Sequence, residues 1–126
     1  MILWLSPMTK TTKHPNLLWR ASGLIVLALI TPLFLIKLPS SGVSTALPLD
    51  KLIHLVFHFC LCAWFLIGGD RWAHVFCLSF LYGLAIEFAQ YFTPDRSFEL
   101  ADLSANIIGA ILAVGIYQKA RRRFHR

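Results

Sequence analysis

The sequence has few charged residues: only 14% of its 126 residues are Asp, Glu, Lys or Arg, and six are acidic. A soluble globular domain has roughly 25% charged and 45–50% apolar residues, whereas 57% of this chain is hydrophobic. The composition therefore argues against a soluble domain and predicts an integral membrane protein. The length predicts a single unit, without room for a soluble catalytic domain beside it.

Signatures of several other protein classes are also missing. The three cysteines, Cys60, Cys62 and Cys77, are an odd number and lie in apolar runs, which argues against a disulfide framework. We expect all three to be small apolar core residues. No glycine-rich phosphate loop, nucleophile elbow or His-Glu-x-x-His motif occurs. The sequence thus predicts neither a cofactor nor a bound metal.

Basic residues give the chain a net charge of +6, but they do not form a nucleic-acid footprint. Most of them lie near the two termini, whereas a nucleic-acid-binding protein gathers them on one folded face. Flanking charge of this kind orients membrane helices and contacts anionic headgroups. We therefore expect membrane lipids as partners, and no nucleic acid.

Four apolar runs, each long enough to cross roughly 30 Å of hydrocarbon as a helix, follow one another along the chain. They span residues 21–38, 50–67, 72–92 and 100–117. No strand-like alternation occurs, so the predicted fold is all-α, a four-helix transmembrane bundle. Its divisions are an N-terminal segment 1–16, the membrane domain 17–118 and a basic tail 119–126. The first run exceeds the usual length of a signal-peptide core, so we expect it to be a span.

The distribution of Lys and Arg predicts the orientation. With four spans, both termini share a side with the turn at residues 68–71, and nine of the twelve basic residues lie there. The other side holds three, Lys37, Lys51 and Arg96. Because basic residues are enriched on the cytoplasmic side, we expect a multi-pass protein of the inner (plasma) membrane with cytoplasmic termini.

Three polar clusters lie near the span ends that this topology places on the outer face. Ionisable groups in hydrocarbon cost about 2.5–3.5 kcal/mol each at mid-membrane and therefore usually mark function. Spacings of three or four residues put side chains on one helix face, and they relate Asp50 to His54 and His58, Glu87 to Gln90, and Asp102 to Asn106. The clusters are Asp50, Lys51, His54 and His58; Glu87 and Gln90; and Arg96, Asp102 and Asn106.

A stripe of small residues, Ala105, Gly109 and Ala113, runs along the fourth span. Small residues let neighbouring membrane helices approach closely, and Asn106 lies beside the stripe. The polar face of this helix is therefore expected to point into the bundle and not at lipid.

Each polar residue also has a purely structural interpretation. Asp50 can cap its helix, and Asp102 can favour a helix N-terminus. His54 and His58 can form interhelical hydrogen bonds, and Glu87 can pair with Arg96 or His54 or stay neutral. The His54/His58 spacing suits zinc, but no general base lies between the two.

Three ordered segments form a recognisable set: Asp50-Lys51-Leu-Ile-His54, the stretch from Tyr82-Gly83 to Gln90, and the stretch from Pro94 to Gly109. Together they resemble the VanZ-like family of small membrane proteins. The resemblance covers residues 48 to about 116. It implies that the pattern residues are Asp50, Lys51, His54, Glu87, Gln90, Arg96, Asp102, Asn106 and Gly109. Two positions depart from it: His58 stands where an aromatic is expected, and Asp95 where glycine is common.

The function expected from these features is binding of an amphiphile, such as an envelope lipid or its precursor, in a polar pocket at the outer face. Arg96 and Lys51 would attract an anionic head group, while Asp50, Glu87 and Asn106 would orient it. The predicted binding residues are Asp50, Lys51, His54, Glu87, Gln90, Arg96, Asp102 and Asn106. The family takes its name from a protein associated with teicoplanin resistance, but resistance does not follow for this chain.

Three alternative functions stay open. The first is an enzyme acting on a lipid-linked substrate, with Glu87 or His54 as the catalytic acid or base. The second is a proton or ion path through the buried titratable groups. The third is a structural bundle that partners another membrane protein, with the polar residues serving only as contacts between helices.

Overall fold

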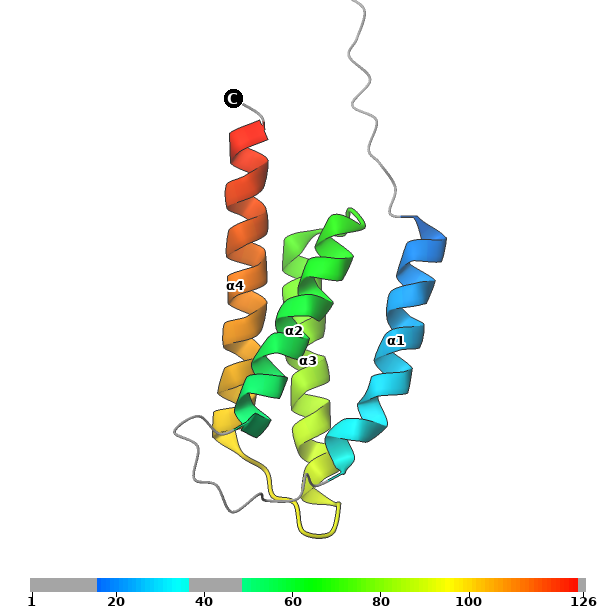
Figure 1. Ribbon diagram of the computed structural model, residues 1–126, viewed down its shortest axis with the longest axis vertical. Helices are drawn as coiled ribbons and strands as arrows, with labels where there is room; N and C mark the ends of the chain where they lie inside the picture. Colours follow the sequence, from blue (N-terminus) through cyan, green and yellow to red (C-terminus); the bar gives the residue numbers. More distant parts are fainter. Residues whose placement is uncertain (1–15, 37–48, 125–126) are drawn as a thin grey trace, which may run out of the picture.

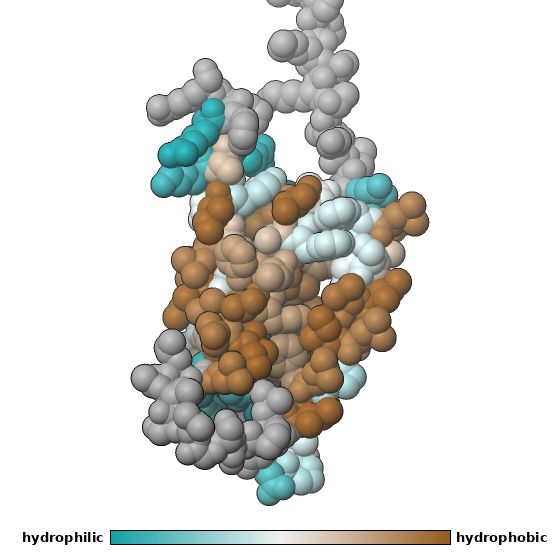
Figure 2. Space-filling model, in the orientation of Figure 1, coloured by the Kyte–Doolittle hydropathy of each residue, from teal (hydrophilic) through white to brown (hydrophobic). Residues whose placement is uncertain are grey.

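The computed structural model describes residues 16–36 and 49–124, which form four helices that alternate in direction along the long axis (Figure 1). These are α1 (Leu17–Leu35), α2 (Leu49–Ile67), α3 (Trp72–Tyr91) and α4 (Leu100–Phe124). No strand occurs among these described residues. All four helices are long and apolar enough to cross a membrane, so the predicted all-α fold is confirmed. Hydrophobic side chains cover the middle of the molecule, and hydrophilic ones gather towards its ends (Figure 2).

The helix bounds differ from the predicted runs mainly at α1 and α4. α1 begins at Leu17, where the Asn16 side chain accepts a hydrogen bond from the Leu18 amide at 3.0 Å and caps the helix. α4 continues through the basic residues to Phe124, and positive charge in its last turn suits the negative end of the helix dipole. The predicted N-terminal segment before Asn16 and the predicted end of the first run at residue 38 lie outside the described residues.

Two tight turns bring α2, α3 and α4 side by side. Gly69 ends α2 with a φ of 96°, a conformation that glycine adopts without strain. Between α3 and α4, Asp95 has a φ of 61°, which is the left-handed region that Asp and Asn tolerate better than most side chains. The resemblance predicted glycine at this position, and the backbone conformation explains why.

α2 and α4 form the tightest helix pair of the bundle. The buried Gly109 faces the backbone of α2, and a Cβ atom at this position would overlap the Leu55 carbonyl oxygen and lie 3.1 Å from the Phe59 nitrogen. Ala105 and Ala113 are buried on the same stripe. The predicted small-residue stripe is therefore the surface on which α2 packs.

The prediction of three core cysteines is wrong for two of them. Cys62 is fully buried, but Cys60 and Cys77 are exposed on the outside of the bundle. Residues two positions apart on a helix lie on nearly opposite faces. Cys60 therefore points outwards when Cys62 points inwards.

α1 packs against α2 and α3. Near its N-terminal end, the rings of Trp19 and Trp64 stack with their centroids 4.2 Å apart, and the Trp19 indole donates a hydrogen bond to the Trp64 carbonyl at 2.8 Å. Arg20 forms an ion pair with Asp70 at the same end. Tryptophan is enriched at membrane–water interfaces, because its ring is apolar and its N–H is polar.

Gly109 and Gly115 provide a matched test of the α2–α4 contact. Gly109→Ala should destabilise the protein by about 1–3 kcal/mol, because the added methyl group overpacks the interface against backbone atoms. Gly115 has no atom within 4 Å of an added Cβ, so Gly115→Ala should be neutral or slightly stabilising, since alanine is the better helix former. Thermal unfolding of both variants in one detergent measures the difference. Equal stability of the two would contradict the close contact.

Candidate functional site

One face of α2 carries the first part of the polar site. His54 and His58 are completely buried on this face, and Asp50, one turn earlier, is partly buried. The spacing of four residues therefore stacks these side chains as the sequence predicted. The two histidines point into the bundle, His54 towards Asn106 on α4 and His58 towards Ser79 on α3.

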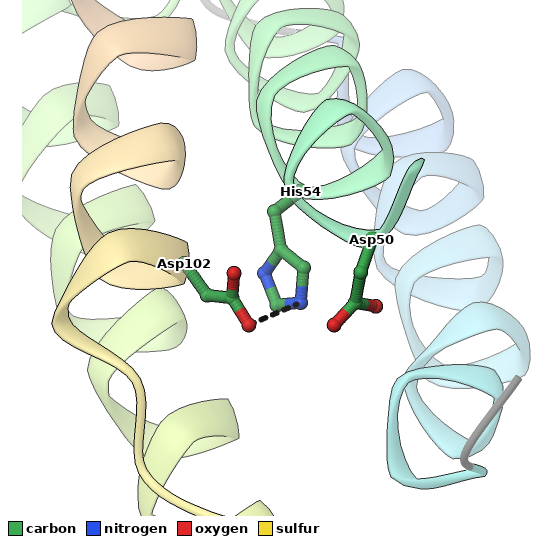
Figure 3. Close-up of side chains that lie close together, drawn as sticks. All are labelled: Asp50, His54 and Asp102. Carbon is green, nitrogen blue, oxygen red and sulfur yellow. Dashed lines mark ion pairs between the residues drawn. The ribbon is translucent and has the colours of Figure 1, made fainter. Parts of the chain in front are cut away.

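His54 lies at the centre of the site, where α2, α3 and α4 meet. Its Nδ1 atom is 3.0 Å from the Asn106 Oδ1 and 3.9 Å from the Glu87 Oε1. Its Nε2 atom is 4.0 Å from the Asp102 Oδ2, and Figure 3 shows the ring between Asp102 and Asp50. One imidazole therefore contacts the polar groups of both neighbouring helices.

Two cations neutralise carboxylates around this histidine. The Lys51 ammonium donates to the Asp102 Oδ1 at 2.9 Å and to the Glu99 Oε2 at 2.7 Å. The Arg96 guanidinium donates to the Asp50 Oδ2 at 3.1 Å. Because Asp102 is almost fully buried, its charge depends on Lys51, whereas Glu99 is half exposed and also has water available.

The C-terminal end of α1 closes the site through its carbonyl groups. Arg96 donates to the Phe34 and Ile36 carbonyl oxygens at 3.2 and 2.7 Å, and Gln90 donates to the Phe34 carbonyl at 2.7 Å. The last carbonyls of a helix have no partner within the helix. These contacts satisfy them and hold α1 on the bundle.

All eight predicted binding residues therefore come together at one end of the bundle. We call them the polar cluster: Asp50, Lys51, His54, Glu87, Gln90, Arg96, Asp102 and Asn106. His58, one turn after His54 on α2, stays outside the polar cluster, because its Nδ1 lies 2.8 Å from the hydroxyl of Ser79 on α3. Glu87 pairs with His54 and accepts a hydrogen bond from the Glu99 amide at 3.1 Å, while Arg96 pairs with Asp50 instead.

The polar cluster is more closed than the sequence predicted. His54, Glu87, Gln90, Asp102 and Asn106 are each at most 1% exposed. Asp50 and Arg96 are the members that line a groove of about 310 Å³ beside α1 and α2. The apolar walls of this groove are Ile30, Leu33, Phe34, Ile36, Ile53 and Phe57.

Three contributors to the site were not among the predicted binding residues. Glu99 lies directly before α4 and precedes Asp102 by three residues, so this spacing could have indicated it. Ser79 is a lone hydroxyl in an apolar run and gave no signal. Phe34 contributes a backbone carbonyl, which no side-chain pattern can reveal.

Comparison with known proteins gives one match. A family model described as VanZ/LLP1 matches residues 2–121, nearly the whole chain. No curated protein and no solved structure matches this chain.

The two carboxylate partners of Lys51 test how far burial determines the strength of these ion pairs. Glu99→Gln should change stability by less than about 1 kcal/mol, as for an exposed pair. Lys51→Met should cost about 3–5 kcal/mol, because it leaves the buried Asp102 without its cation. The double variant Lys51→Met/Asp102→Asn should lose less than the sum of its single variants. Unfolding free energies in one detergent measure all of these, and additive losses would argue against a buried pair.

Proposed function

The chain belongs to the VanZ/LLP1 family and has four helices able to cross a membrane, and on this basis we propose that it binds a phosphate-bearing envelope lipid or lipid-linked precursor. The observation that carries the proposal is the groove beside α1 and α2. Its walls are apolar along their length, and its polar residues are the paired Asp50 and Arg96. An amphiphile has the same distribution of polarity.

The apolar part of the groove suits an acyl or prenyl chain. Six of its eight lining residues are Ile, Leu or Phe, and ligand sites are usually apolar clefts with few polar groups that fix orientation. The groove lies on the outside of the bundle, where Leu33, Ile36 and Ile53 are exposed. A lipid chain can therefore enter sideways from the bilayer without opening the helix bundle.

The polar part of the groove suits a phosphate head group. Arginine binds phosphate through several planar N–H donors, and the Arg96 side chain is only 12% exposed, so its charge is weakly screened. The guanidinium already donates to Asp50 and to the carbonyls of Phe34 and Ile36, so a phosphate would have to compete with these acceptors. Asp50 beside it offers an anion for the amine of a zwitterionic head group.

We further propose that this end of the bundle lies at the outer leaflet of the inner membrane, with both termini cytoplasmic. Nine of the twelve Lys and Arg residues fall on the side of the termini. The long basic end of α4, with Arg121, Arg122 and Arg123 in its last turn, matches the enrichment of positive charge on the cytoplasmic side.

A second candidate function is an enzyme acting on such a lipid. His54 lies 3.9 Å from Glu87 and 4.0 Å from Asp102, an arrangement in which a carboxylate can orient an imidazole that transfers a proton. If it is an enzyme, Glu87→Gln should retain bound lipid but stop its conversion, which lipid extracts would reveal.

Native mass spectrometry of the protein extracted with its surrounding lipid tests binding. The wild type should retain a phosphate-bearing lipid, and Arg96→Ala should lose most of it because the guanidinium is removed. Ile53→Trp, which fills the apolar wall, should lose it too. Arg71→Ala, at an exposed arginine in the opposite turn, is the matched control and should bind as the wild type does.

The identity of the retained molecule separates the two lipid sources. A mass matching a bulk phospholipid assigns the groove to membrane lipid, and a lipid-linked precursor assigns it to envelope synthesis. Equal lipid retention by all folded variants would sink the proposal and leave the polar cluster as a contact between helices.

Fusion reporters test the orientation. Green fluorescent protein fused to the C-terminus should fluoresce, because it folds in the cytoplasm. Alkaline phosphatase fused at the same place should be inactive, because it does not fold there. Alkaline phosphatase fused after Arg96 should be active. The reverse pattern of activities would place the polar cluster on the cytoplasmic side.

A further inference from the structure

Three potential metal-ligating groups meet at the end of α2. Asp50, His54 and Asp102 each offer one donor atom, and the three atoms lie within 4.8 Å of one another. Figure 3 shows the imidazole of His54 between the two carboxylates, which come from different helices. His54 and Asp102 are buried, and Asp50 is partly buried. A small cation placed among them would be reached by all three side chains.

The hydrogen bonding of His54 leaves one ring nitrogen for such a cation. The Asn106 Oδ1 can only accept, so the bond at 3.0 Å requires His54 to carry its proton on Nδ1. In the neutral ring the Nε2 atom then presents a lone pair, and this atom is fully buried and has no hydrogen-bond partner among the described residues. It faces the Asp102 Oδ2 at 4.0 Å. Two acceptors facing each other in a buried site are stabilised when a cation lies between them.

The arrangement also matches how proteins prepare a histidine ligand. Metal-binding histidines usually donate their other N–H to a carbonyl or carboxylate, which fixes the tautomer and the ring orientation. Here the side-chain carbonyl of Asn106 accepts that proton. Asn106 would therefore act as a positioning residue that does not itself contact the ion.

The surrounding charges leave room for a divalent ion. Lys51 donates a hydrogen bond to the Asp102 Oδ1, and Arg96 donates one to the Asp50 Oδ2. The other oxygen of each carboxylate is therefore left to coordinate an ion. Asp50, Glu99 and Asp102 pair with the cations Lys51 and Arg96, and Glu87 lies 3.9 Å from His54. The three paired carboxylates outnumber the two cations, so this end of the bundle favours an added cation.

We propose that Asp50, His54 and Asp102 bind a divalent transition-metal ion of the zinc or manganese class. One imidazole with two carboxylates suits such ions, whereas calcium and magnesium prefer oxygen ligands alone. Metal–ligand bonds of about 2.1 Å place tetrahedral ligands roughly 3.5 Å apart, so the donor atoms close in slightly around the ion. Three protein ligands leave a position for water or a ligand oxygen. The proposal does not rest on lipid binding.

The sequence did not predict this site because it paired the wrong residues. His54 and His58 have a spacing that suits zinc, but His58 bonds Ser79 instead. The third ligand, Asp102, is on α4 and far away in the sequence. Only the packing of α2 on α4 brings it to His54.

Isothermal titration with Zn²⁺, Mn²⁺ and Co²⁺ tests the site, using chelator-treated protein without a polyhistidine tag in lipid-free detergent. The wild type should bind one ion per chain. Asp50→Asn and His54→Gln should lower the affinity by at least about tenfold, because loss of even a ligand's hydrogen-bond partner costs about 10–100-fold. His74→Asn, at an exposed histidine on α3, is the control that should bind as the wild type does.

The visible spectrum of the Co²⁺ protein gives a second readout. Bands of a four- or five-coordinate ion should appear in the wild type and be absent from Asp50→Asn, whose partly exposed position makes it the variant best able to keep the fold. No stoichiometric binding by the wild type would overturn the proposal. So would binding that persists in folded Asp50→Asn and His54→Gln, since the ion would then lie elsewhere. Because no lipid takes part in these measurements, their outcome is separate from that of the lipid proposal.

Discussion

The close approach of α2 and α4 at Gly109 is the constraint on which the polar cluster depends. Gly109 lies against the Leu55 carbonyl, and His54 is the residue before Leu55 while Asn106 is one turn before Gly109. When the two backbones touch, these two side chains are brought to a distance of 3.0 Å. A larger residue at Gly109 would separate the helices and leave both polar groups buried without each other, which is costly in hydrocarbon.

Burying many ionisable groups in so small a bundle is stable only where each has partners. Lys51 compensates the buried Asp102, and Arg96 compensates Asp50. The carbonyl groups at the end of α1 accept from Arg96 and Gln90, so the polar residues also determine where α1 lies. The hydrogen bonds from Arg96 and Gln90 therefore attach α1 to the bundle. Residues that take part in them, Phe34, Ile36 and Arg96, also line the groove.

The arrangement separates two chemical environments that share Asp50. On one side lies an apolar groove with Arg96 beside the same carboxylate, and on the other lies the closed group of His54 and Asp102. A head group bound at Arg96 and an ion bound at His54 would thus be separated by the side chain of Asp50 alone. Because Asp50 is only partly buried while His54 and Asp102 are fully buried, a ligand in the groove would reach the closed group through Asp50.

The sequence by itself determined the membrane class, the four helices and the face on which each polar residue lies, because hydropathy and helical spacing are local properties. It also indicated that Gly109 and Asp95 occupy special positions. Only the tertiary structure decided which groups meet: His58 with Ser79, Arg96 with the carbonyls of α1, and Asp102 with His54. Those pairings depend on how each helix is rotated about its axis and on where along their lengths the helices contact one another. The sequence pattern of a single helix contains neither. Backbone carbonyls at a helix end are invisible to any side-chain pattern, so the closing of the cluster by α1 could not be predicted.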